Sequence, residues 1–151
     1  MHEIHQDILK VSEGFILHQV NCRGVMGAGL ARAIADNWPV VEERYHSLSK
    51  PNPKYPYLLL GRSQTVHVGG KLYVVNLFGQ DGFGRSGVHT NYAALAKALA
   101  TFRLGAEVTG ILTAGPVYIP FKLGCGLGGG DWNRVKPIIE AIIPEAVICI
   151  P

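Results

Sequence analysis

The chain alternates between apolar runs of strand length and segments with helical spacing. The stretch FILHQVN, residues 15–21, is apolar and leads into a helical pattern over residues 27–37. A second helical segment opens at Pro39 and is expected to reach about Ser49, where the proline-rich stretch SKPNPKYPY predicts a loop. At the start of the chain, EIHQDI alternates over residues 3–8 and predicts a short opening strand.

The middle of the chain predicts a hairpin and then a long helix. TVHV and KLYVVNLF are strand-like runs on either side of Gly69 and Gly70, which is the pattern of a hairpin with a two-residue turn. A helix is expected from Thr90 or Asn91, because the apolar residues that follow fall on one stripe. Gly105 is expected to cap the end of this helix.

The last third of the chain completes an alternating α/β pattern. Residues 106–117 fit a helix or a strand, whereas VYIPFKL and the terminal AVICI predict buried strands. Asp131 is a good N-cap for a helix over residues 132–143, which Pro137 is expected to kink or break. Strands alternating with helices predict an α/β fold of three α/β/α layers, and the hairpin makes the central sheet mixed.

Composition narrows the class of protein. With 151 residues, 48% apolar and 17% charged, the chain fits one globular domain. Its polar N-terminus is unlike a signal peptide, and no apolar run approaches the roughly 18 residues of a membrane span, so no membrane partner is expected. Cys22, Cys125 and Cys149 are odd in number and lack metal-site spacing, which predicts reduced thiols, a cytoplasmic location and no structural metal.

Glycine is the unusual residue of this composition. Its 19 residues cluster in three places, two of which follow a strand and precede a helix. Glycines at a helix start let backbone N–H groups approach an anion, so the clusters predict cradles for a ligand with two phosphates. The alternative is that they form ordinary tight turns. Neither G-x-G-x-x-G nor the P-loop motif is present.

Three motifs together resemble the macrodomain, an ADP-ribose-binding α/β/α module. They are QDILK after the first strand, HQVNCRGVMGAGLA at the first glycine cluster, and IPFKLGCGLGGGDW before the last helix. The resemblance runs over nearly the whole chain and implies a single macrodomain over residues 1–151. The motifs are most similar to the branch of terminal ADP-ribose glycohydrolases, antitoxin-type DNA ADP-ribosyl hydrolases and ADP-ribose-1″-phosphate phosphatases.

The resemblance implies a binding role for each matching residue and no separate cofactor. Asp7 matches the family's acceptor for the adenine amino group, with Ile8 beside it, although an aspartate here also fits a turn. Asn21 falls near the distal ribose, and Phe83, flanked by glycines, is a candidate to cover a ribose or adenine. The residues expected to surround the phosphates are Gly27, Ala28, Gly29, Leu30, Gly124, Cys125, Gly126, Leu127, Gly128 and Gly129. Cys125 is expected to be an apolar filler rather than a nucleophile.

The chain departs from the glycohydrolases of this branch at two positions. The loop after the central strand, NLFGQDGFGRSG, has no lysine, and Gly128 stands where those enzymes have an acid. If the chain hydrolyses an ADP-ribose derivative at the distal ribose, the candidates for catalysis are His18, which matches a histidine of the phosphatases, and Asp131. The alternatives are a strand histidine held by hydrogen bonds and a plain helix cap.

We expect the chain to bind ADP-ribose and to hydrolyse a derivative of it at the distal ribose, either ADP-ribose-1″-phosphate or an ADP-ribosyl conjugate of protein or nucleic acid. The alternative is a non-catalytic reader of ADP-ribose, which the missing lysine and the shifted acid support. Nucleic acid is a further partner if Lys50, Lys54, Arg62, Lys71 and Arg85 form one basic rim, but the net charge of +3 favours an ordinary solvated surface.

Overall fold

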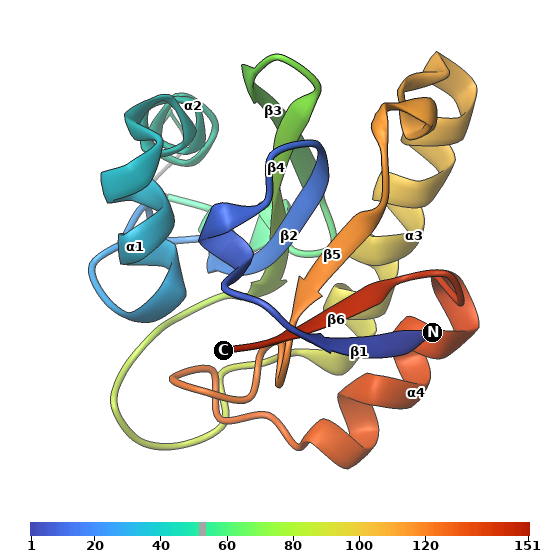
Figure 1. Cartoon of the computed structure of the whole chain (residues 1–151). Helices are drawn as coiled ribbons and strands as arrows, with labels where there is room; N and C mark the ends of the chain where they lie inside the picture. The colour runs from blue at the N-terminus through green and yellow to red at the C-terminus, as the bar shows by residue number, and fades with distance from the viewer. Residues whose placement is uncertain (52–53) are drawn as a thin grey trace.

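The computed structural model describes residues 1–51 and 54–151, and these build a six-stranded mixed sheet between two layers of helices (Figure 1). The strand order is β1-β6-β5-β2-β4-β3. The strands are β1 (His2–His5), β2 (Gly14–Asn21), β3 (Ser63–Gly69), β4 (Leu72–Gln80), β5 (Val117–Pro120) and β6 (Val147–Ile150). The three-layer α/β/α prediction is therefore confirmed.

The central strand β2 pairs in parallel with β4 on one side and with β5 on the other. The hairpin predicted around Gly69 and Gly70 is present, because β3 pairs antiparallel with β4 and forms an edge of the sheet. Parallel strands end at the same edge of a sheet, so β2, β4 and β5 deliver the three glycine clusters to one end of the molecule.

Helices cover both faces of this sheet. Figure 1 shows α1 and α2 on one side of the sheet and α3 and α4 on the other. The helices are α1 (Gly29–Asn37), α2 (Pro39–Ser49), α3 (Tyr92–Thr109) and α4 (Trp132–Ile142). Residues of β2 alternate between the two cores: Phe15 and Leu17 pack with α3 and α4, whereas Ile16 and Val20 pack with α1 and α2. A strand buried on both faces is apolar throughout, which explains the run in the sequence.

Helix α3 is longer than the sequence predicted from Gly105. It starts after Asn91, whose side chain accepts a hydrogen bond from the Ala94 N–H, and it continues through Gly105 to Thr109. The cap is Gly110, which adopts the left-handed conformation with φ 77°. The prediction that Gly105 ends the helix is wrong, because Gly105 lies inside the helix and does not adopt the positive φ of a glycine cap. The ambiguous residues 106–117 are therefore mostly helical, ending in a short 3₁₀ turn at Ile111–Ala114.

Two other expected boundaries move, and the break expected at Pro137 is absent. The opening strand ends at His5 rather than Ile8, because Asp7 caps a 3₁₀ turn over Ile8–Lys10. Helix α4 runs without interruption through Pro137, and β5 ends at Pro120. Of the predicted loop over residues 49–57, positions 52 and 53 lie outside the described residues, and Pro56–Leu59 forms a 3₁₀ turn.

Two further properties follow from the described residues. None of the helices in the described part of the chain combines the length and the hydropathy needed to cross a membrane. Cys22, Cys125 and Cys149 are free thiols, and Cys22 and Cys149 are buried in the core.

The glycine inside α3 generates a stability prediction. Gly105→Ala is expected to raise the free energy of unfolding by about 0.5–1 kcal/mol, because alanine restricts the unfolded chain and favours helix. A Cβ at this position meets no atom within 4 Å. Urea denaturation followed by circular dichroism measures the change. Gly110→Ala is the matched control, and it is expected to destabilise the protein because its backbone requires positive φ.

Candidate functional site

A cavity of about 910 Å³ opens at the carboxyl ends of the parallel strands. This size is typical of a site for an organic ligand. Fourteen residues that the sequence proposed for the site line it: Asp7, Ile8, His18, Asn21, Gly27, Ala28, Gly29, Leu30, Phe83, Gly124, Cys125, Gly126, Leu127 and Gly128. Gly129 and Asp131, which the sequence also proposed, are not among the lining residues. The structure therefore brings together motifs that are more than a hundred residues apart.

The first glycine loop, residues 22–28, is held by two side chains beneath it. Asn21 donates to the Val25 carbonyl at 2.7 Å, and its Oδ1 accepts from the Arg23 N–H at 2.9 Å. The buried Tyr45 hydroxyl accepts from the N–H groups of Gly24 and Val25 at 3.0 and 3.1 Å. Burial raises the pKa of Tyr45, so its hydroxyl stays neutral. Asn21 thus lines the cavity but shapes its own loop.

The first loop ends in a helix without a side-chain cap. The N-cap of α1 is Ala28, which supplies no side-chain acceptor to the first-turn N–H groups. By contrast, Asn91 caps α3 and Asp131 caps α4. Because the first residues of α1 line the cavity, its N-terminal partial positive charge is directed at whatever binds there.

The third glycine loop, residues 123–130, faces the start of α1. A Cβ on Gly29 would lie 3.7 Å from Leu127 Cδ1, so the two loops meet across the cavity. The N–H groups of Gly126, Leu127 and Gly128 have no hydrogen-bond acceptor among the described residues. Consecutive free backbone donors opposite an uncapped helix make a site for an anion.

The glycines of this third loop have different structural roles. A Cβ on Gly128 would lie 2.6 Å from Thr90 Oγ1, and one on Gly129 would collide with the Gly87 carbonyl. These glycines are required by packing within the protein. A Cβ on Gly126 meets no atom within 4 Å, so Gly126 leaves open space on the cavity side. Packing within the protein therefore accounts for Gly128 and Gly129, whereas Gly126 leaves room for the anion cradle that the sequence predicted.

The second glycine loop, residues 81–89, closes another side of the cavity. It contributes Phe83, which is 55% exposed, and the exposed Arg85. Asp81 at its start forms a bidentate ion pair with Arg23 of the first loop, with distances of 3.1 and 3.0 Å. Large exposed aromatic surface at a cavity mouth is available to a ligand.

Asp7 lies at the opposite end of the chain from the glycine loops but lines the same cavity. Its Oδ1 accepts from the Leu9 N–H at 3.0 Å, which is the turn role that the sequence allowed. The side chain is exposed, so its carboxylate is also open to an amino group of a ligand. Ile8 beside it is buried in the core shared with α1 and α2.

His18 lines the cavity but is only 1% exposed. Its Nε2 lies 2.5 Å from Asn76 Oδ1. Asn76 donates its own N–H to Gln64 Oε1, which orients the amide so that Oδ1 accepts from the imidazole. Burial lowers the pKa of His18 to about 4, with the hydrogen bond to Asn76 acting in the opposite direction. The ring is therefore neutral at physiological pH, with Nδ1 buried and without a partner among the described residues.

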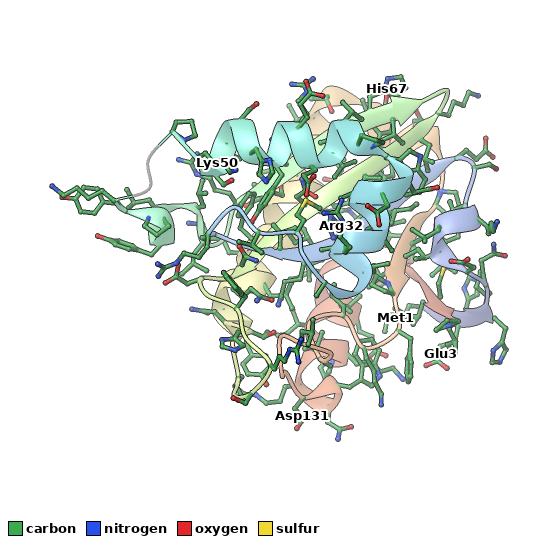
Figure 2. All side chains as sticks on the ribbon, turned by 90° about the vertical axis from the view of Figure 1, so that its left-hand side faces the viewer. Met1, Glu3, Arg32, Lys50, His67 and Asp131 are labelled. Carbon is green, nitrogen blue, oxygen red and sulfur yellow. The ribbon has the colours of Figure 1, made fainter. Side chains whose placement is uncertain are left out.

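Asp131 is not among the residues that line the cavity, and its side chain caps α4. Its Oδ1 accepts from the Asn133 N–H at 2.9 Å at the start of α4, and the residue lines a smaller hollow with Lys122 and Trp132. In Figure 2, Asp131 lies at the foot of the molecule beside α4. The structure thus does not bring Asp131 to His18, and the catalytic role of this aspartate stays a prediction that the geometry does not favour.

Cys125 lines the cavity, and its thiol donates to the Leu123 carbonyl at 3.3 Å. Burial raises the pKa of this thiol, so a reactive thiolate is not favoured. This fits the expectation of an apolar filler.

The five proposed rim cations do not surround the cavity. Only Arg85 lines it. Lys50 packs near Gly24, whereas the Lys71 carbonyl accepts from the Gly14 N–H at the other end of β2. Figure 2 shows Lys50 and the hairpin marked by His67 well apart. In the described ranges, no group of three His, Cys, Asp or Glu side chains is placed to hold a metal ion.

Sequence reasoning missed the polar side chains beneath the loops. Gln19 lines the cavity and donates to Gln80 Oε1 at 2.7 Å and to Thr90 Oγ1 at 2.9 Å. The Thr90 hydroxyl in turn donates to the Gly124 carbonyl at 2.6 Å. A polar residue inside the apolar run of β2 was the available signal, but its partners lie about sixty and seventy residues away.

Solved structures similar to this chain include macrodomains. A macrodomain protein from Streptomyces coelicolor superimposes with a TM-score of 0.77 at 26% identity, covering 99% of this chain and 97% of that one. The macrodomain of Mycobacterium tuberculosis DarG gives a TM-score of 0.81 at 23% identity, covering 100% and 98%. Thermosipho africanus DarTG in complex with ADP-ribose gives 0.76 at 19% identity, covering 99% of this chain and 41% of that one.

Comparison of the sequence with protein-family models and with curated proteins gives no match. The structural likenesses, joined to the three motifs, identify the chain as a protein with the macrodomain fold, and the resemblance drawn from its sequence is confirmed.

The buried histidine predicts a pH dependence of stability. The pKa of His18 is about 4 in the folded state, below the ordinary 6.5, so the unfolded chain takes up the proton first on acidification. The stability that the neutral ring contributes is present above pH 6.5 and is lost as the pH falls toward 4. Urea denaturation is expected to give a free energy of unfolding about 2 kcal/mol lower at pH 5 than at pH 7 from this group. In His18→Gln the difference between the two pH values should shrink by that amount, and an unchanged difference would contradict the assignment.

Proposed function

We propose that this chain binds ADP-ribose, with the diphosphate between the start of α1 and the third glycine loop. The observation that carries the proposal is the uncapped N-terminus of α1 facing the free N–H groups of Gly126, Leu127 and Gly128. Two sets of backbone donors on opposite sides of one cavity suit a ligand with two linked phosphates. The ADP-ribose complex of a protein with the same fold supports this choice of ligand.

The two ends of the cavity suit the two ends of ADP-ribose. Asp7 offers a carboxylate acceptor to the adenine amino group, and the largely buried Ile8 lines the cavity beside it. Asn21 and Phe83 also line the cavity, Asn21 beneath the first loop and Phe83 with an exposed ring, and their proposed role is to surround the distal ribose. This arrangement keeps the roles that the sequence implied for these residues.

The geometry favours a reader of ADP-ribose over a hydrolase. His18 is the one histidine lining the cavity among the described residues, but its ring is shielded and bonded to Asn76. A general base must reach the proton that it removes, and the buried Nδ1 of His18 does not reach solvent. Asp131 is occupied as a helix cap outside the cavity.

Binding is tested with a charge placed at the open glycine of the third loop. Wild type is expected to bind ADP-ribose with a dissociation constant on the order of micromolar in a calorimetric titration. Gly126→Glu should abolish binding, because its carboxylate enters the space where the backbone N–H groups meet an anion. Gly126 is preferred to Gly29 for this test, because Gly29 has a φ of 59° and any substitution there would add backbone strain to the effect of the charge.

The matched control is Gly105→Glu, which makes the same substitution on the exposed surface of α3, away from the cavity. It should bind as wild type does. A wild-type chain that gives no heat with ADP-ribose at high protein concentration would remove the proposed function, and a folded Gly126→Glu variant that binds normally would remove the proposed place of the diphosphate.

Turnover distinguishes the reader from the hydrolase. ADP-ribose-1″-phosphate and an ADP-ribosylated oligonucleotide are each incubated with the protein and analysed by chromatography. As a reader, wild type should leave both intact while it binds ADP-ribose. Cleavage of either substrate that slows about a hundredfold or more in His18→Ala would instead establish hydrolysis with His18 in its mechanism. Asp131→Ala is then expected to cost helix stability rather than rate.

A further inference from the structure

Gln19 occupies the point where the second and third glycine loops come together. It is the third residue from the end of β2, and its side chain extends to the face of the sheet that α3 and α4 cover, as the alternation with Phe15 and Leu17 requires. Its amide group donates both of its N–H hydrogens, one to Gln80 Oε1 at 2.7 Å and one to Thr90 Oγ1 at 2.9 Å.

The hydrogen-bond partners of Gln19 are the two stem residues of the second glycine loop. Gln80 and Thr90 form an antiparallel bridge, and residues 81–89 between them carry Phe83 and Arg85 to the cavity. Gln80 also donates to the Gly82 carbonyl at 2.8 Å, which orients its amide so that Oε1 accepts. Gln19 therefore holds both sides of this stem.

Thr90 connects the same stem to the third glycine loop. Its hydroxyl donates to the Gly124 carbonyl at 2.6 Å, and its N–H donates to the Gly128 carbonyl at 3.0 Å. With its hydroxyl hydrogen used in this way, Thr90 Oγ1 has only acceptor capacity left for Gln19. Position 19 thus faces two acceptors, and a side-chain amide, with two N–H donors, satisfies both.

One glycine of β4 and two glycines of the third loop make room for this side chain. A Cβ on Gly79 would collide with Gln19 Oε1, a Cβ on Gly124 would lie 3.0 Å from that atom, and a Cβ on Gly128 would lie 3.0 Å from Gln19 Nε2. The backbone of β4 and of the third loop therefore packs directly against the Gln19 side chain.

We propose that Gln19 is a positioning residue that joins the second and third glycine loops, so that Phe83, Arg85 and the free N–H groups of the third loop are held together for one ligand. The proposal rests on the proposed binding of ADP-ribose. The Gln19 amide bonds to both stem residues of the second loop, and one of them, Thr90, bonds to the third loop. Loss of the two hydrogen bonds of Gln19 therefore loosens both loops at once.

The test removes the two hydrogen bonds while keeping the volume of the side chain. Gln19→Leu is compared with Gln64→Leu, a matched control on β3 that also loses two side-chain hydrogen bonds, to Asn76 and to the Arg44 carbonyl, but does not line the cavity. Amide hydrogen exchange is measured on the ligand-free proteins. Gln19→Leu should exchange faster in residues 81–90 and 124–130 together, and Gln64→Leu should leave both segments as in wild type.

Binding supplies the second measurement. By calorimetry, Gln19→Leu should bind ADP-ribose at least about tenfold more weakly than wild type, and Gln64→Leu should not. Thr90→Val should match Gln19→Leu, and Thr90→Ser, which keeps the hydroxyl, should restore wild-type affinity and exchange. Combining Gln19→Leu with Thr90→Val should add little to either change alone.

The outcomes separate this inference from the proposed function. Unchanged exchange in the two segments, or equal changes in both glutamine variants, would overturn the role of Gln19. If wild type fails to bind ADP-ribose, the proposed function is lost, and the exchange measurements alone decide whether Gln19 joins the loops.

Discussion

The parallel pairing of β2 with both β4 and β5 is the constraint on which the site depends. Each of these strands ends at the same edge of the sheet, and each is followed by one of the three glycine loops. Burial of β2 on both faces fixes its register, because a shift by one residue would exchange the side chains of the two cores. The register in turn sends His18 to one face and Gln19 to the other, which gives the two polar residues of one strand separate surroundings.

The glycines of the loops divide into two physical kinds. Some, such as Gly128 and Gly129, are required because another part of the protein occupies the space of a side chain. Others, such as Gly126, face open space and leave the backbone accessible from the cavity. The sequence shows both kinds as one letter, so their count points to a site without telling which of them touch a ligand.

Buried and half-buried polar groups maintain the shape of the cavity. Tyr45 supports the first loop, and Gln19 with Thr90 supports the second and third. Their hydrogen bonds are worth roughly 1 kcal/mol each, but an unpaired buried partner costs more, which resists rearrangement of the loops. A site preorganised in this way binds a ligand without first ordering its own backbone.

The sequence by itself determined the alternation of strands and helices, the hairpin and the positions of the glycine loops, because hydrophobic periodicity and glycine act locally. Its motifs also indicated the macrodomain fold and fourteen of the residues that line the cavity. It misplaced the end of α3, since a helix continues through Gly105 when packing supports it. Only the tertiary structure decided that His18 is buried and bonded to Asn76, that Asp131, a helix cap as the sequence predicted, lies outside the cavity lining, and that Gln19 meets Gln80 and Thr90. Each of these depends on contacts between distant segments or on which way a loop turns, and such information is absent from local spacing.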